Sequence, residues 1–122
     1  MSLRDDALRA FGALPSEKVD VDGLVFEVRG LSVKDANALY DRITVRKGSD
    51  VSVDRERWNV EWVMACTFDP ATGERVFEAA DRDTLLGSAA FPVQTLAAAA
   101  TRLSGYGSSD DDAAREMKSE SA

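Results

Sequence analysis

Histidine is absent from this chain of 122 residues, and cysteine occurs once, as Cys66. Without histidine the chain has no Ser-His-Asp or Cys-His catalytic group, no histidine general base and almost none of the usual zinc sites. A single cysteine forms no internal disulfide, which suits a reducing cytoplasm. An enzyme would have to use carboxylates or Mg²⁺, so these absences favour a protein that acts by binding.

Excess positive charge and long apolar runs are missing as well. The net charge is −7, whereas proteins that bind nucleic-acid phosphates or anionic membranes carry a clustered basic surface. No apolar run approaches the roughly 20 residues that span a bilayer. The N-terminal segment 1–15 carries acidic residues early and has no long apolar centre, so it does not match a secretion signal. We therefore expect neither nucleic acid nor a membrane as a partner.

The residues that are present fit one small domain. Apolar residues make up 44% of the chain, which is enough for a single modest core. Two alternating runs flank Asp22-Gly23, a dipeptide favoured in two-residue hairpin turns. Because a lone hairpin is barely stable, its apolar face is expected to pack on helices. The residue pairs that this turn predicts on the apolar face are Val21 with Leu24 and Val19 with Phe26.

Helical patterns flank this hairpin on both sides. We expect a short helix over 3–13, which Pro15 ends, and a second helix within 31–44, which Ser32 caps. The segment 45–53 is predicted to be a loop, because its central GSD is typical of breaks between elements.

Two further helices are predicted in the second half of the chain. The segment 52–68 favours a helix that begins at Ser52 or Asp54, with a strand over 60–68 as the alternative. The segment 91–107 is the clearest helix, with Gly105 as its C-terminal cap. Its apolar stripe consists of Val93, Leu96, Ala97, Ala100 and Leu103.

The stretch TFDPATGERVFEAAD, residues 67–81, has the composition of an active-site loop. Asp69 and Pro70 also suit the first two positions of a type I turn, and Gly73 suits a positive φ. The sequence places no base, no partnered nucleophile and no metal shell beside them. We interpret the stretch as a connector that leads to a helix capped near Asp81.

Composition changes after residue 107. The segment 108–122, SSDDDAAREMKSESA, has no aromatic residue and is predicted to be a disordered acidic tail. Its run Asp110–Asp112 is interpreted as solvated rather than metal-binding. The prediction is an α+β domain over residues 1–107, mainly helical with an N-terminal β-hairpin, followed by this tail, with no cofactor and no metal.

Several motifs follow one another in a particular order: FEVRGLSVKDANALYDR, DPATGERVF, DRDTLL and a helix ending RLSG, then the acidic tail. This order resembles that of the tail assembly chaperones of long-tailed phages. In that family a strand ending V-x-V-R-G-L leads into a charged helix. A DPxTGExxF turn then precedes an acidic helix, and an LxxAxxRLSG-like helix closes the domain. The likeness covers roughly residues 15–107.

The resemblance implies a protein that is not an enzyme and is absent from the finished virion. Such chaperones bind the long, aggregation-prone tape measure protein and keep it soluble in the host cytoplasm while tail tube subunits polymerise around it. Many of these families make a short product and a longer product by a programmed frameshift, and this chain would match the short one or the N-terminal domain of the long one. The implied partners are the tape measure protein and the tail tube protein, and self-association is compatible with this role.

A chaperone for an amphipathic helix needs an apolar groove in a charged body. Aromatic residues are favoured at such surfaces, although in a small domain most of them form the core and a single exposed Trp is the expected exception. Cys66 is expected to be a buried, unreactive thiol. The candidate partner-binding residues are Trp58, Trp62, Phe68 and Phe77, with Phe91 as a further aromatic anchor.

The sequence leaves open the role of a small basic patch and two other possible functions of the chain. Arg42, Arg46 and Lys47 are interpreted as solvated surface, or as a contact for an acidic segment of a partner. A small acidic inhibitor or adaptor would need a dense acidic face, whereas DRERWNVEW interleaves both signs. A carboxylate-based enzyme would need a pair of converging buried acids, and the sequence places its carboxylates among polar neighbours or at caps.

Overall fold

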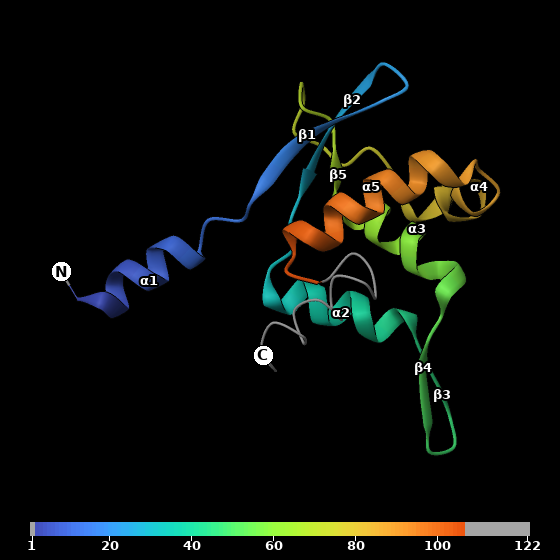
Figure 1. Ribbon diagram of the computed structural model, residues 1–122, viewed down its shortest axis with the longest axis horizontal. Coiled ribbons are helices and arrows are strands. Elements are labelled where there is room, and N and C mark those ends of the chain that lie inside the picture. Colours follow the sequence, from blue (N-terminus) through green and yellow to red (C-terminus); the bar gives the residue numbers. More distant parts are fainter. Residues whose placement is uncertain (1, 107–122) are drawn as a thin grey trace, which may run out of the picture.

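The computed structural model describes residues 2–106, and these form an α+β fold, as predicted (Figure 1). The predicted tail, 108–122, lies outside the described residues. The elements in chain order are α1 (Leu3–Phe11), β1 (Ser16–Val21), β2 (Leu24–Arg29), α2 (Val33–Ile43), β3 (Thr44–Lys47), β4 (Asp50–Val53), α3 (Arg55–Cys66), β5 (Thr67–Phe68), the 3-10 turn η1 (Ala79–Asp81), α4 (Arg82–Leu86) and α5 (Ala90–Leu103).

The predicted hairpin is confirmed with its register. Val21 pairs with Leu24 and Val19 with Phe26 in the antiparallel ladder of β1 and β2. Asp22 and Gly23 both have positive φ, at 54° and 82°, as a two-residue turn of this kind requires. The strand β5 adds to the free edge of β2, so the sheet order is β1-β2-β5.

The helix predicted over 52–68 is confirmed as α3, with Asp54 rather than Ser52 as its cap. The Asp54 side chain accepts hydrogen bonds from the backbone amides of Glu56 and Arg57, which satisfies two of the unpaired N–H groups of the first turn. The strand alternative applies only to Thr67 and Phe68, which form β5. Ser32 caps α2 in the same manner, through the amide of Asp35.

The loop predicted over 45–53 is wrong. Thr44–Lys47 and Asp50–Val53 form the antiparallel hairpin β3–β4, which projects from the body in Figure 1. The GSD sequence does break the chain, but as a hairpin turn in which Gly48 has a φ of 62°. At the base of the hairpin the amide of Asp54 donates to the carbonyl of Ile43 over 2.7 Å.

The core lies where α5 meets both α3 and the β1–β2 hairpin. Ala97, Ala99 and Ala100 of α5 are buried in this layer. Val28 and Val21 point from the hairpin into this layer, and α2 covers α3 with Leu39 and Ile43. The core residues are Val21, Val28, Ala36, Leu39, Ile43, Trp62, Val63, Cys66, Leu96, Ala97, Ala99 and Ala100.

Candidate functional site: an arginine-lined groove

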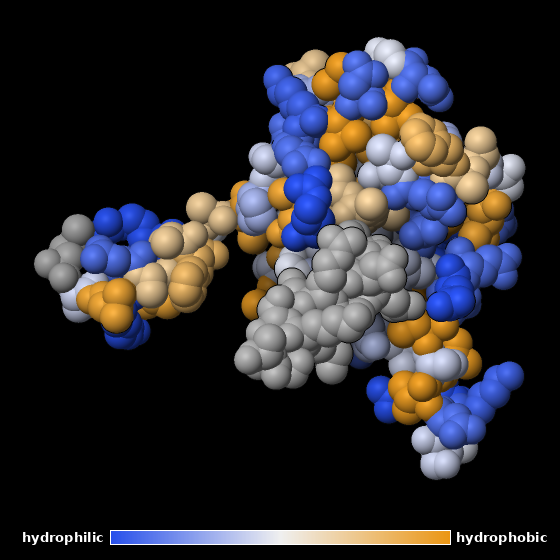
Figure 2. Space-filling model, in the orientation of Figure 1, coloured by the Kyte–Doolittle hydropathy of each residue, from blue (hydrophilic) through white to orange (hydrophobic). Residues whose placement is uncertain are grey.

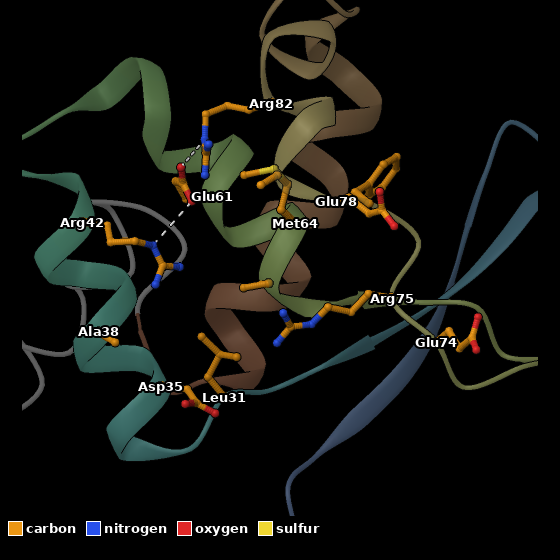
Figure 3. A pocket seen from close by; sticks show the side chains of 13 residues that line it. Leu31, Asp35, Ala38, Arg42, Glu61, Met64, Glu74, Arg75, Glu78 and Arg82 are labelled. Carbon is orange, nitrogen blue, oxygen red and sulfur yellow. Dashed lines mark hydrogen bonds and ion pairs between the residues drawn. The ribbon is translucent and has the colours of Figure 1, made fainter.

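A groove of about 580 Å³ lies between α2, α3 and the segment 74–82 (Figure 3). The groove is lined by apolar side chains and by charged side chains of both signs, and most of its lining surface is polar. The apolar lining residues are Leu31, Ala38, Met64, Ala65, Phe77 and Ala79, and the charged ones are Asp35, Arg42, Glu61, Glu74, Arg75, Glu78 and Arg82.

A buried carboxylate, that of Glu61, lies at the inner wall of this groove. Glu61 is 1% exposed, and its Oε1 accepts a hydrogen bond from Nε of Arg82 over 2.6 Å. Arg57, one turn earlier on α3, lies 3.4 Å from the same oxygen, and Arg42 of α2 lies 3.8 Å from Oε2. Both oxygens of Glu61 therefore face guanidinium groups.

This cluster ties three helices together at the groove. The charge-assisted bond to Glu61 raises the pKa of Arg82 above its ordinary value, so this arginine stays charged. Since Arg42 belongs to α2 and Arg82 begins α4, the Glu61 side chain fixes both helices against α3. A carboxylate held in this way by three cations is a positioning group and is poorly placed to act as a general base.

Glu61 was not among the predicted site residues, because all carboxylates of the chain were expected at helix caps or among polar neighbours. The available signal was its position inside the apolar run Val60–Met64 of a predicted helix. A charged residue in such a run is rarely buried unless it is paired, and Arg57, one turn earlier on the same helix, was the partner within local reach.

The turn after β5 positions the far wall of the groove. The predicted side-chain bond of Asp69 and the positive φ of Gly73 are confirmed, whereas the backbone bond that closes the turn spans one residue more than that of the predicted type I turn. Asp69 Oδ1 accepts from the amide of Ala71 over 2.8 Å, the amide of Gly73 donates to the Asp69 carbonyl over 2.7 Å, and Gly73 has a φ of 76°. This turn directs Arg75 toward Leu31 across the groove, while Glu74 points away from it (Figure 3). The guanidinium of Arg75 also lies 6.0 Å from the ring of Phe68.

The four predicted partner-binding aromatics do not share one surface. Phe77 lines the groove and stacks on Phe26 of the hairpin. Phe68 lies under the guanidinium of Arg29 at 4.1 Å. The cross-strand partner of Phe68 is Glu27, the residue after Phe26, so Phe68 is on the opposite face of β2 from Phe26. Trp62 is completely buried between Trp58 and the ring of Tyr106, so in this fold it belongs to the core and offers no surface to a partner.

Trp58 lies at a different hollow, on the side where α3 meets α5. It is partly exposed and makes an edge contact with Tyr40 at 6.4 Å. The hollow beside it measures about 300 Å³, and its other lining residues are Asn59, Gln94, Ala97, Ala98 and Thr101. Phe91 is exposed at the start of α5. The aromatic candidates thus mark the groove and this smaller hollow separately.

Cys66 is buried, as predicted. Burial raises the pKa of the Cys66 thiol to about 12, against the opposing effects of the nearby Arg75 charge and a hydrogen bond with Ser104. The residues of the predicted basic patch do not lie together: Arg42 forms an ion pair with Glu61, whereas Arg46 and Lys47 lie exposed on β3.

Among residues 2–106 no three Cys, Asp or Glu side chains converge in a way that could hold a metal ion.

The sequence matches no family model, and it matches neither a curated protein nor a solved structure. Within residues 2–106, no helix combines the length and the apolar character needed to cross a bilayer. The function is therefore inferred from the groove and from the order of the sequence motifs.

Proposed function

We propose that this chain is a tail assembly chaperone that binds the tape measure protein of a long-tailed phage and keeps it soluble while the tail tube assembles. The supporting observation is the groove beside Glu61, whose lining combines apolar side chains with charged side chains of both signs. An amphipathic helix has the complementary surface, an apolar stripe bordered by charged residues.

The apolar side chains of the groove suit a client that presents many similar but non-identical segments. Met64 is among its lining residues, and the flexible thioether adapts to side chains of different shape. Leu31 and Phe77 add further apolar lining. Glu61 keeps α2 and α4 in place, so the groove exists before the client arrives and little ordering is needed on binding.

On this proposal the chain works by binding and not by catalysis. It acts in the host cytoplasm, meets the tape measure protein and the tail tube protein there, and is left out of the mature virion. The runner-up, a small acidic inhibitor or adaptor, would require a surface of one sign. Arg42, Arg75 and Arg82 at the groove favour the chaperone instead.

The proposal is tested by blocking the groove without disturbing the fold. Ala38 is an exposed residue of α2 that lines the groove, and its neighbour Asn37 is exposed on the same helix but lies outside the groove. Ala38→Glu and Asn37→Glu therefore change the charge equally, and only the first fills the groove. Each variant is co-expressed with the tape measure protein of the same phage, and the soluble complex is measured by size-exclusion chromatography.

We expect the wild type and Asn37→Glu to co-elute with the tape measure protein, and Ala38→Glu to lose most of the complex. If the wild-type chain and a soluble tape measure protein elute separately, the chaperone function is wrong. If Ala38→Glu and Asn37→Glu retain the complex equally, the groove is not the binding site.

A further inference from the structure

The N-terminal arm, residues 3–14, is the most exposed apolar element in the described chain. It consists of α1 and a short tether, and it extends away from the body in Figures 1 and 2. No residue of α1 is buried. The large apolar side chains of the arm are Leu3, Leu8, Phe11 and Leu14, which are 84%, 57%, 80% and 51% exposed.

An isolated helix of this length does not persist in water. α1 has 9 residues, whereas lone helices shorter than about 12 residues are marginal even with ideal sequences. Its N-cap Ser2 and its amphipathic pattern nevertheless specify a helix. Such a helix is stabilised when a partner covers its apolar face, which makes the arm a binding element.

The root of the arm adjoins the groove. The carbonyl of Pro15 accepts a hydrogen bond from the amide of Gly30 over 2.8 Å, which anchors the end of the tether. The next residue after Gly30 is Leu31, which lines the groove. The tether residues 12–14 span at most about 11 Å when extended. A helix that continues past Leu31 out of the groove therefore passes within reach of α1.

The charges of the arm disfavour a membrane as its partner. Arg4 lies 3.7 Å from Asp5, and Arg9 lies 4.0 Å from Asp6, so the polar side of α1 is balanced. Helices that bind anionic membranes carry a surplus of Lys and Arg on this side. The neutral polar side of α1 suits a protein helix whose own charges vary along its length.

The small size of the arm disfavours a second copy of the same arm. Two copies of α1 packed together would bury only a few large side chains each. That area falls well short of the roughly 1,200 Å² of a stable interface. The arm can contribute only as part of a larger surface, and the groove is the adjoining one.

We propose that α1 is a second contact element for the client, and that it packs its apolar face on the same amphipathic helix that occupies the groove. This inference rests on the proposed chaperone function. Because arm and groove belong to one chain, contact at the groove raises the effective concentration of α1 at the client. The arm then covers apolar surface that extends beyond the groove.

The test uses a double variant of the arm, Leu8→Asp with Phe11→Asp. Its control is Leu24→Asp, which changes a side chain that is 63% exposed at the tip of the β1–β2 hairpin. The probe is a fluorescently labelled amphipathic segment of the tape measure protein, and binding is followed by anisotropy. We expect the double variant to bind about tenfold more weakly or worse, the control to bind as the wild type does, and all three to unfold at the same temperature.

Other outcomes separate this inference from the chaperone function. If the double variant binds the segment as tightly as the wild type while Ala38→Glu does not, the arm has no role and the groove remains the site. If the wild type is a dimer in light scattering and the double variant is a monomer, the arm binds a second copy and the inference is wrong. Sedimentation of the wild type with phosphatidylglycerol vesicles, lost in the double variant, would assign the arm to lipid and overturn it.

Discussion

Glu61 is the residue on which the geometry of the groove depends most. Its carboxylate is buried, whereas the arginines around it are partly exposed, and they come from three helices. Burial of a charge is costly unless its hydrogen-bonding capacity is met. Here Arg57 and Arg82 donate hydrogen bonds to Oε1, and Arg42 forms an ion pair with Oε2. As a consequence α2 and α4 are held against α3.

Neutralising Glu61 is expected to lower stability. Glu61→Gln keeps the shape of the side chain but replaces an ionised acceptor, so Arg42, Arg57 and Arg82 lose their common partner. We expect the free energy of unfolding to fall by about 2 kcal/mol, measured by urea denaturation. Glu74→Gln, at an exposed position of the same groove, should change it by less than about 0.5 kcal/mol. Equal stability of both variants would show that the cluster is not structural.

Cys66 gives a prediction for alkaline pH. Its pKa is about 12 in the fold and near 9.0 in the unfolded chain, so above pH 9 the unfolded chain binds fewer protons than the folded one. The contribution of this thiol to stability is therefore complete below pH 9 and falls as the pH rises from 9 to 12. The stability difference between the wild type and Cys66→Ala, measured by urea denaturation, should shrink over this range. A constant difference would contradict the burial of the thiol.

Among the elements, α5 meets the segment that follows β2 at a contact that only glycine permits. A Cβ on Gly30 would lie 2.5 Å from the carbonyl oxygen of Leu103, at the end of α5, and 3.1 Å from Cγ of Pro15. Neither a backbone carbonyl nor the proline at the tether can move freely. The close approach of the two elements therefore depends on the missing side chain.

Gly30→Ala is expected to push the end of α5 away from the hairpin. Overpacking of this kind costs about 1–3 kcal/mol, and the loss should appear as a lower unfolding temperature. Gly87→Ala is the matched control, because its φ is −88° and its nearest neighbours are 3.7 Å away. Similar unfolding temperatures for both variants would mean that the contact at Gly30 relaxes freely.

Elements with local signals were predicted well from the sequence. The turn at Asp22-Gly23, the cap at Ser32 and the turn after Asp69 depend on residues within a few positions of one another. The β3–β4 hairpin was missed because its two strands are only four residues each and most of their side chains are exposed. Short exposed strands carry little hydrophobic alternation, so the break at Gly48 alone pointed to a loop.

The groove could not be predicted from local signals. It forms only when α2, α3 and the segment after β5 come together, and its charged cluster joins residues up to 40 positions apart in the chain, from Arg42 to Arg82. The aromatic candidates illustrate the same limit. Phe77 lines the groove, whereas Trp62 is buried in the core, and the aromatic residue type alone does not predict which of the two positions a side chain takes.

In the described part of the molecule, the groove and the N-terminal arm differ in character, and the root of the arm lies near the groove. The groove is built on rigid helices, and the N-terminal arm is joined to the body through a short tether at Pro15. A rigid site with an attached arm suits a long helical client, since the two contacts reinforce each other. The net charge of −7 would help to keep such a complex dispersed.

The central claim is that this chain shields apolar surface of the tape measure protein, and an aggregation assay tests it most directly. Denatured tape measure protein is diluted into buffer with increasing amounts of the chain, and light scattering is followed over time. We predict that scattering falls in proportion to the chain added and that the Ala38→Glu variant suppresses it far less. Aggregation at the same rate with or without the wild-type chain would contradict the account.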